Sequence, residues 1–278
     1  YRYADYINEY RRIMQFNKNK ELRIHRWYPF VEGYSKEFIE SIVNEQTQKV
    51  DLCLEPFSGS GTTALELSTK GINCISFEVN PFMFTLSKAK LKVSLYKQRT
   101  IKSHILKMKK YIVSLDDDKI NPYSRFSTLI EGEEKKKWNI DLEVFIAIEK
   151  LKTAIDSLST ILYKELYIVC LANILLEYSN LYRNGKCLSY KKGWKDNLYS
   201  QEQVITSFFN FINNIIIEDL ENIETNNFSN HNLLFLGDAR KLIFENVDDD
   251  SVDLIITSPP YLNSRDYTDS YMLECVIS

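Results

Sequence analysis

Two short segments of the sequence combine residue types that can bind small ligands. FSGSG at residues 57–61 follows the apolar run DLCLEP, and SPPY at residues 258–261 follows the apolar run DLIIT. Glycines let the backbone approach a ligand closely, and the first amides of a following helix attract polar or anionic groups. Because short apolar runs of this kind are typical of buried strands, both segments are expected at the end of a strand.

The SPPY segment offers hydrogen-bond acceptors next to an aromatic ring. Pro259 and Pro260 fix two φ angles and lack amide donors, so the chain leaves the strand in a stiff direction. The hydroxyl of Ser258 and the carbonyls of Ser258 and Pro259 can accept hydrogen bonds, and Tyr261 adds a flat face. This set suits a planar group that carries an exocyclic amino group. Taken alone, the segment also fits a simple strand terminator with a surface tyrosine.

Two acidic residues follow further apolar runs. Glu78 ends the run INCISFE, 17 positions after Gly61, and can accept hydrogen bonds from both hydroxyls of a ribose. Asp238 follows NLLFLG and can accept a hydrogen bond from an adenine amino group. The G-x-G-x-x-G pattern of dinucleotide-binding proteins has Ala64 at its third position here, which known variants permit. The glycines and Glu78 fit dehydrogenases and methyltransferases alike, but dehydrogenases have no counterpart of SPPY at that place.

With these residues the chain resembles the DNA amino-methyltransferases that use S-adenosylmethionine, a family marked by F-x-G-x-G and [DNS]-P-P-[YFW]. The resemblance covers residues 22–92 and 232–270, and RWYPFVEGYS at residues 26–35 resembles the family's segment that closes over the methionine end of the cofactor. It implies S-adenosylmethionine as cofactor, DNA with a flipped target base as partner, and no metal. By resemblance, the cofactor-binding residues are Tyr34, Glu55, Phe57, Ser58, Gly59, Gly61, Thr62, Glu78 and Asp238.

The resemblance assigns the chemistry to the SPPY segment. Acceptors at Ser258 and Pro259 would hold the hydrogens of the amino group that receives the methyl group, Pro260 would stiffen the loop, and Tyr261 would stack on the base. Serine at the first position is associated with N4 of cytosine, which is therefore the expected target. The alternatives are N6 of adenine in DNA, N2 of guanine in RNA, and a non-catalytic subunit that binds cofactor or DNA. A cognate restriction nuclease is a further expected partner, and a prokaryotic cytoplasm the expected location.

The order of the expected elements predicts the fold class. It is α/β, with a Rossmann-like methyltransferase fold, a doubly wound and mostly parallel sheet, and a large helical insertion between the second and third strands. Within the insertion, apolar residues recur at three- and four-residue steps over 143–158, 164–182 and 205–223. The expected divisions are an N-terminal helical segment with the cofactor-closing motif at 1–46, core at 47–91, insertion at 92–230, and core at 231–278. Because the last part ends soon after SPPY, we expect a fragment that lacks the family's C-terminal part.

One linker in the insertion, YRNGKCLSYKKGWK at residues 182–195, is both basic and aromatic. It is expected either to be a solvated loop or to contact phosphates and stacked bases of a nucleic acid. The residues expected to contact nucleic acid are Arg183, Lys186, Lys191, Lys192 and Lys195.

Composition narrows the remaining function classes. The 278 residues are 44% hydrophobic, which is enough for a sizeable core, and the net charge of −3 announces no nucleic-acid partner by itself. Five widely spaced cysteines without a Cys-x-x-Cys pair favour neither a disulfide framework nor a zinc site. The sequence has neither a signal-peptide pattern nor an apolar run long enough to span a bilayer.

Overall fold

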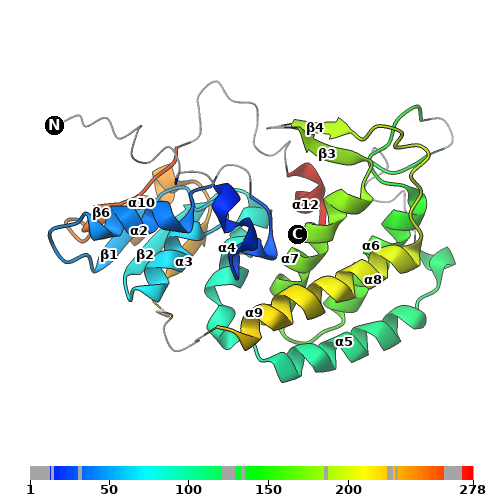
Figure 1. Ribbon diagram of the computed structural model, residues 1–278, viewed down its shortest axis with the longest axis horizontal. Coiled ribbons are helices and arrows are strands. Elements are labelled where there is room, and N and C mark those ends of the chain that lie inside the picture. Colours follow the sequence, from blue (N-terminus) through cyan, green and yellow to red (C-terminus); the bar gives the residue numbers. More distant parts are fainter. Residues whose placement is uncertain are drawn as a thin grey trace. The chain divides into compact units, whose positions relative to one another are not determined.

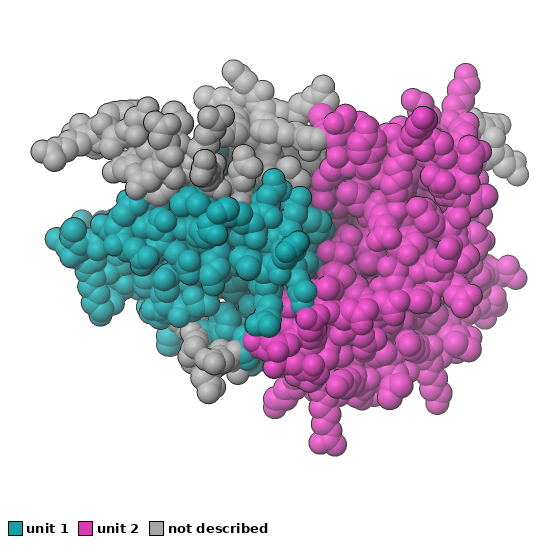
Figure 2. Space-filling model, viewed as in Figure 1, with its two compact units in different colours: residues 1–95, 223–264 teal, residues 96–222, 265–278 magenta. Residues whose placement is uncertain are grey.

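The computed structural model forms two compact units, Tyr1–Leu95 with Ile223–Ser264 and Tyr96–Asn222 with Arg265–Ser278, coloured teal and magenta in Figure 2. We call them unit 1 and unit 2. The insertion expected at 92–230 corresponds to the first segment of unit 2, and 265–278, expected in the core, group with unit 2 as well. The structure describes residues 13, 16–30, 33–120, 129–132, 135–184, 187–223, 228, 231–259 and 271–277.

Unit 1 alternates strands and helices (Figure 1). Its strands are β1 (Leu52–Glu55), β2 (Asn73–Glu78), β5 (Leu233–Leu236) and β6 (Leu254–Ile255). Its α-helices are α2 (Lys36–Asn44), α3 (Thr62–Thr69), α4 (Pro81–Leu91) and α10 (Ala239–Asn246). Three 3₁₀ turns complete the described elements, η1 (Phe16–Glu21), η2 (His25–Trp27) and η3 (Val93–Leu95).

The four strands form one parallel sheet in the order β5-β2-β1-β6. Each of these strands was expected from an apolar run that ends in a polar turn. The order reverses at β1, which has β2 on one side and β6 on the other, as in a doubly wound sheet. The predicted α/β fold class is therefore confirmed, including the helical insertion between the second and third strands.

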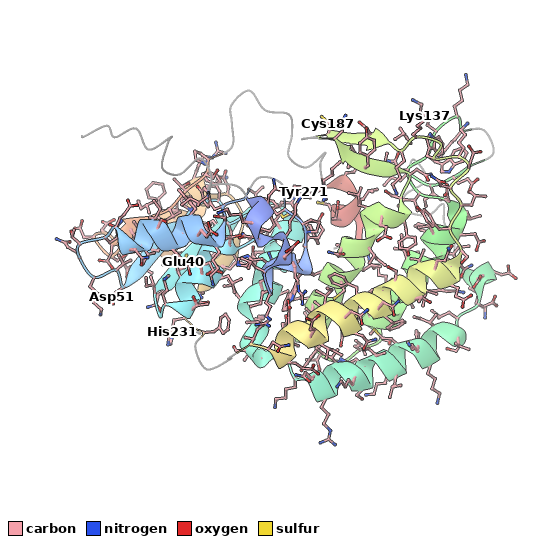
Figure 3. The ribbon with its side chains drawn as sticks, viewed as in Figure 1. Glu40, Asp51, Lys137, Cys187, His231 and Tyr271 are labelled. Atoms are coloured by element: carbon pink, nitrogen blue, oxygen red, sulfur yellow. The ribbon has the colours of Figure 1, made fainter. Side chains whose placement is uncertain are left out.

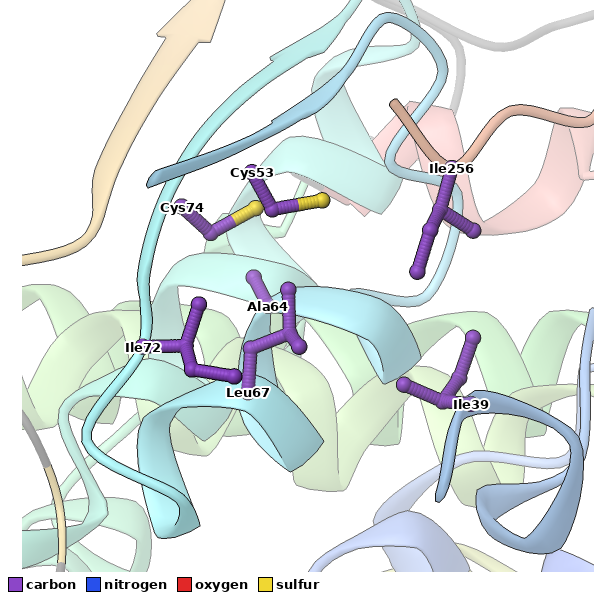
Figure 4. Close-up of a cluster of buried hydrophobic side chains, with 7 residues drawn as sticks. All are labelled: Ile39, Cys53, Ala64, Leu67, Ile72, Cys74 and Ile256. Carbon is purple, nitrogen blue, oxygen red and sulfur yellow. The ribbon is translucent and has the colours of Figure 1, made fainter. Parts of the chain in front are cut away.

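Alternate residues of the strands face two apolar clusters. On one face, Cys53 and Cys74 pack with Ala64 and Leu67 of α3 and with Ile39 of α2 (Figure 4). The opposite face is covered by α10, and its cluster consists of Leu54, Ile75, Phe77 and Ala239. Since neighbouring residues of a strand point to opposite faces, helices on both sides bury the central strands β1 and β2, whereas Leu236 of β5 and Ile255 of β6 remain about half exposed.

Unit 2 is mainly helical (Figure 1). Its longer helices are α5 (Gln98–Val113), α6 (Leu142–Asp156), α7 (Ile161–Tyr178) and α8 (Gln201–Phe211). Shorter elements are η4 (Asp117–Lys119), the π-helix η5 (Ile212–Ile217), α9 (Glu218–Glu221) and α12 (Met272–Ile277). The three helical patterns predicted for the insertion correspond to α6, α7 and the run from α8 to α9. The segment expected to be a linker instead contains an antiparallel hairpin, β3 (Leu181–Asn184) and β4 (Cys187–Tyr190).

Candidate cofactor and catalytic site

The two motif segments leave the sheet side by side. Parallel pairing sets Leu54 of β1 opposite Ile255 of β6, and the amide of Ile256 donates to the carbonyl of Leu54 at 3.1 Å. Residues 57–61 and residues 256–259 therefore start from the same edge of unit 1. In doubly wound sheets, ligands bind outside the carboxyl ends of the strands at the point where the strand order reverses.

Residues 57–61, which we call the glycine loop, require glycine at two positions. Gly59 and Gly61 have φ of +52° and +74°, a conformation that residues with a Cβ avoid. A Cβ on Gly61 would lie 2.8 Å from Oγ and 3.0 Å from Cα of Ser87 in α4, and one on Gly59 would lie 3.0 Å from the ring of Phe30. The loop thus turns tightly between α4 and the ring of Phe30, which belongs to the expected cofactor-closing motif.

Glu78, expected to bind the ribose, lies at the end of β2 and contacts the glycine loop. Its Oε2 accepts from the amide of Gly59 at 2.7 Å, and its Oε1 accepts from the amide of Asn80 at 2.8 Å. Burial raises the pKa of this carboxyl above its ordinary value, while the backbone amides oppose the rise. The structure therefore brings together Glu78 and Gly59, two residues that the sequence assigned to the cofactor site. Asn80 caps α4 by accepting from the amides of Phe82 and Met83.

Glu55, expected near the methionyl group, faces the interior. Its side chain is buried, and its Oε2 accepts from the hydroxyl of Ser76 at 3.2 Å. Burial raises the pKa of Glu55 to about 8, so the carboxyl holds a proton at neutral pH. In this structure the Glu55 carboxyl lies in the interior beside Ser76 of β2 and does not line an open site.

Asp238, expected near the adenine, lies two residues after β5 and caps α10. Its carboxylate accepts from the amide of Arg240 at 3.0 Å and from two nitrogens of the Arg240 guanidinium. These hydrogen bonds from Arg240 lower the pKa of Asp238 to about 2. The amide of Gly237 donates to the carbonyl of Glu78 at 2.8 Å, so the segment that carries Asp238 starts beside the end of β2.

The other expected cofactor residues differ in exposure. Phe57, the first residue of the loop, is 36% exposed, whereas Ser58 and Thr62 are buried. The amide of Ser58 donates to the carbonyl of Phe77, and Thr62 begins α3. Tyr34 is half-buried and packs on Phe38 and the cluster around Ile39. Phe57 is therefore the side chain of this group that offers a free face to a ligand.

The expected catalytic segment is described in part. Ser258 and Pro259 are exposed and lie three and four residues after the end of β6, at the edge where the glycine loop leaves β1. Pro260 and Tyr261 lie outside the described residues, as does Lys186 of the basic segment.

Several residues around the glycine loop were not predicted from the sequence. Buried His25 of η2 donates through Nε2 to Glu66 of α3 at 2.6 Å, and Lys36 of α2 pairs with the same carboxylate at 3.2 Å. Burial opposes ionisation of Glu66, but the hydrogen bond and charge of His25 lower its pKa. Lys90 of α4 is fully buried and donates to the carbonyl of Ser60 at 3.1 Å. No sequence pattern marked these contacts, because buried residues lie on several sides of α3 and α4 and no helical period separates a buried face from an exposed one.

In unit 2, two of the expected nucleic-acid contacts have partners within the protein. The guanidinium of Arg183 pairs with the buried Glu274 of α12 at 2.6 Å and lies over the ring of Tyr271, labelled in Figure 3. The ammonium of Lys191 donates to carbonyls at the end of α7, including that of Ser179 at 2.6 Å. Both side chains therefore stabilise the fold of unit 2 in this structure.

Other lysines of unit 2 gather around aromatic rings. Lys195 lies 5.7 Å from the ring of Trp138 and 5.4 Å from that of Trp194, and Lys137 (Figure 3) lies 5.4 Å from the ring of Tyr190. The rings contact one another, with Trp194 at 4.8 Å from Trp138 and 5.2 Å from Tyr190. Together with the exposed neighbours, we call this the lysine–aromatic patch: Lys136, Lys137, Trp138, Tyr190, Lys192, Trp194 and Lys195.

Neither a metal-binding cluster nor a membrane span is found in the part of the chain that the structure describes. Within it, His, Cys, Asp and Glu side chains form no group of three or more that could hold a metal ion. The described helices include none with the length and apolar character needed to cross a membrane.

Comparisons with known proteins find similarity to DNA methyltransferases. A family described as DNA methylase, of the N6 and N4 type, matches residues 6–89. Type II methyltransferase M.BsoBI of Geobacillus stearothermophilus is 28% identical over 95% of this chain and 54% of its own length. M.AvaI of Nostoc sp. is 25% identical over 96% of this chain and 56% of its own, and M.MvaI of Kocuria varians is 25% identical over 93% and 58%.

The chain thus spans little more than half the length of these relatives. No solved structure matches it significantly. The family match and the relatives confirm the predicted resemblance to DNA amino-methyltransferases, enzymes whose methyl donor is S-adenosylmethionine.

Proposed function

We propose, from the resemblance to DNA amino-methyltransferases, that this chain moves a methyl group from S-adenosylmethionine to an exocyclic amino nitrogen of a base in DNA. The observation that carries the proposal is the parallel register of β1 and β6, which starts the glycine loop and Ser258 from one edge of the sheet. A donor site and an acceptor site on neighbouring loops are what a direct transfer between two bound groups needs.

The residues of the glycine loop fit the cofactor. The loop is held by two glycines at positive φ, its first residue Phe57 is partly exposed, and the Glu78 carboxylate at the neighbouring strand end can accept hydrogen bonds from hydroxyl groups. In the proposed site the loop contacts the methionyl group, Glu78 binds the ribose and Asp238 binds the adenine. The bound cofactor supplies a methyl group on a sulfonium, which is electrophilic without help from a metal.

Ser258 and Pro259 would orient the amino group that receives the methyl. The lone pair of an exocyclic amino nitrogen is delocalised into the ring, so the nitrogen is a poor nucleophile. When the Ser258 hydroxyl and the Pro259 carbonyl accept its two hydrogens, the lone pair turns toward the methyl group. In-line positioning of this kind supplies up to about 7–11 kcal/mol of rate acceleration. We propose N4 of cytosine as the target because serine stands at the first position of the motif.

Calorimetry tests the cofactor site. Glu78→Ala should weaken S-adenosylmethionine binding by about 1.5–3 kcal/mol, because the ribose hydroxyls lose a charged acceptor. Glu45→Ala, an exposed position just beyond α2, is the matched control and should leave affinity unchanged. Equal affinities of the two variants would remove Glu78 from the site, and strong binding of NAD in place of S-adenosylmethionine would contradict the proposed function.

Nucleoside mass spectrometry tests the reaction and names the base. DNA from cells that express the protein, with any flanking sequence its gene encodes, should contain N4-methylcytosine, and Ser258→Ala should lower its amount. N6-methyladenine instead would keep the reaction and change the base. DNA without either modified base would contradict the proposed activity.

We further propose that the lysine–aromatic patch contacts the DNA backbone. Support comes from Lys137 and Lys195, which lie over three partly exposed rings, and from Lys136 and Lys192, which are exposed and adjacent in sequence to residues of this group. Arg183 and Lys191, expected at first to contact nucleic acid, have partners in unit 2 and are not part of this proposal.

Salt-dependent binding tests the patch. Replacing its four lysines with glutamine should weaken DNA binding and reduce the log–log salt slope by about 0.9 for each phosphate that the protein no longer neutralises. The control replaces four exposed lysines elsewhere in unit 2, Lys102, Lys107, Lys110 and Lys119. If both quadruple variants change the slope equally, the patch holds DNA no better than any other basic surface.

A further inference from the structure

Two side chains of α4 hold the backbone of the glycine loop. The hydroxyl of Ser87 donates to the carbonyl of Gly59 at 2.8 Å, and the amine of Lys90 donates to the carbonyl of Ser60 at 3.1 Å. The donors are three residues apart and so lie on one face of the helix. Consecutive carbonyls of the loop are therefore turned toward α4 and bonded there.

Two amides of the same loop have partners outside α4. Gly59 donates to Glu78 at 2.7 Å, and Gly61 donates to the carbonyl of Ser58 at 2.9 Å. The absence of a Cβ on Gly61 lets the loop approach Ser87 this closely. The loop conformation thus depends on α4 as well as on its own glycines.

Burying the amine of Lys90 costs desolvation free energy, which a side chain that only filled space would not require. Its side chain is fully buried, with the ring of Phe16 at 5.9 Å from the amine. A methionine would occupy nearly the same volume without an amine to desolvate. Burial lowers the pKa of Lys90 to about 7, and the amine keeps an N–H for the Ser60 carbonyl in either charge state.

We propose that Lys90 and Ser87 are positioning residues that fix the glycine loop in the conformation that binds the cofactor. The inference rests on the proposed function of this loop, and it assigns to α4 a role that neither motif of the sequence carries. Without the two donors, the carbonyls of Gly59 and Ser60 are free to rotate, and the loop samples other turns before the cofactor binds. Part of the binding free energy is then spent on ordering the loop.

Hydrogen exchange and calorimetry on matched variants test the proposal. Lys90→Met and Ser87→Ala each remove one donor, and Lys88→Met, a lysine of the same helix whose ammonium lies over the ring of Phe84, is the control. Without cofactor, the amides of Gly59 and Gly61 should exchange about tenfold faster in the first two variants, whereas amides of β1 and β2 keep their protection. Affinity for S-adenosylmethionine should fall about tenfold, which corresponds to about 1.4 kcal/mol, and the control should match the wild type in both measurements.

The outcomes separate this inference from the proposed function. Faster exchange that spreads over β1 and β2 in both Lys90→Met and Ser87→Ala would mean that the side chains stabilise unit 1 generally, and would overturn the positioning role. Unchanged exchange at Gly59 and Gly61 in a folded variant would overturn it as well. If Lys90→Met does not fold, Ser87→Ala decides alone. A wild-type chain that binds no S-adenosylmethionine would refute the proposed function, and the exchange data would still decide how α4 acts on the loop.

Discussion

Glu55 makes the stability of unit 1 depend on pH. Its pKa is about 8 in the folded protein and ordinarily 4.5, so between these values the folded state holds a proton that the unfolded state has lost. The free energy of unfolding therefore falls as the pH rises, by at most about 1.4 kcal/mol per pH unit. We expect Glu55→Gln to flatten this slope, and Glu45→Gln to leave it unchanged. Urea denaturation between pH 5 and pH 7 measures this slope. Above about pH 7 the lowered pKa of Lys90 makes stability rise with pH, so the measurement stays below that range. An unaltered slope in Glu55→Gln would mean that Glu55 is ionised in the fold.

Gly61 and Gly71 provide a matched pair of glycines with positive φ. Both have φ above +70°, but a Cβ on Gly61 would meet the backbone of Ser87 at 3.0 Å, whereas nothing lies within 4 Å of one on Gly71. Gly71→Ala should therefore cost about 1–2 kcal/mol for the left-handed conformation alone. Gly61→Ala should cost about 1–3 kcal/mol more for the steric overlap. Equal losses in urea denaturation would show that α4 yields to the added methyl group.

Candidate site residues could be predicted from the sequence where the residue type and its place after an apolar run are informative. Residues that act through packing could not. Gly59, Gly61 and Glu78 lie at the ends of apolar runs, where glycines and an acidic residue are typical of a ligand-binding turn. Lys90 lies in α4, where polar and apolar residues alternate without a clear period. Its burial depends on how α4 packs against the glycine loop. The hydrophobic pattern of the sequence therefore does not predict the contact between Lys90 and the glycine loop.

At the scale of elements, the strands were predictable because each is short, apolar and followed by a polar turn. The β3–β4 hairpin was not, since Arg183, Lys191 and Lys192 made the segment read as a basic loop. Its strands pair with each other alone among the described residues, and the partners of its cations come from α7 and α12, which are distant in sequence. The composition of residues 182–195 therefore indicated a basic surface segment. Tertiary contacts determined which of its cations pair within unit 2 and which are exposed.

Lys191 and Lys192 distinguish a cation that stabilises a helix end from one that is exposed. The ammonium of Lys191 bonds carbonyls at the end of α7, where the helix dipole favours positive charge. Lys191→Met should lower the unfolding free energy of unit 2 by about 1–2 kcal/mol, and Lys192→Met should change it by less than about 0.5 kcal/mol. Chemical denaturation followed by circular dichroism of the helices checks both values. If Lys192→Met proves the more destabilising, Lys191 is not the cap of α7.

On the scale of the whole molecule, each unit has a core of its own, so the cofactor should stabilise one of them selectively. A ligand that binds the folded state at 100 times its dissociation constant adds about 2.7 kcal/mol to the stability of the part that binds it. The glycine loop, Glu78 and Asp238 all belong to unit 1. With saturating S-adenosylmethionine, hydrogen exchange of the slowest amides in β1, β2 and α3 should therefore slow by up to about 100-fold, the ratio that follows from the same linkage. The slowest amides of α6 and α7, in unit 2, should keep their rates. Equal slowing in both sets of amides would show that the two units unfold as one. Slowing in unit 2 alone would mean that the cofactor binds unit 2, which would contradict the proposed site.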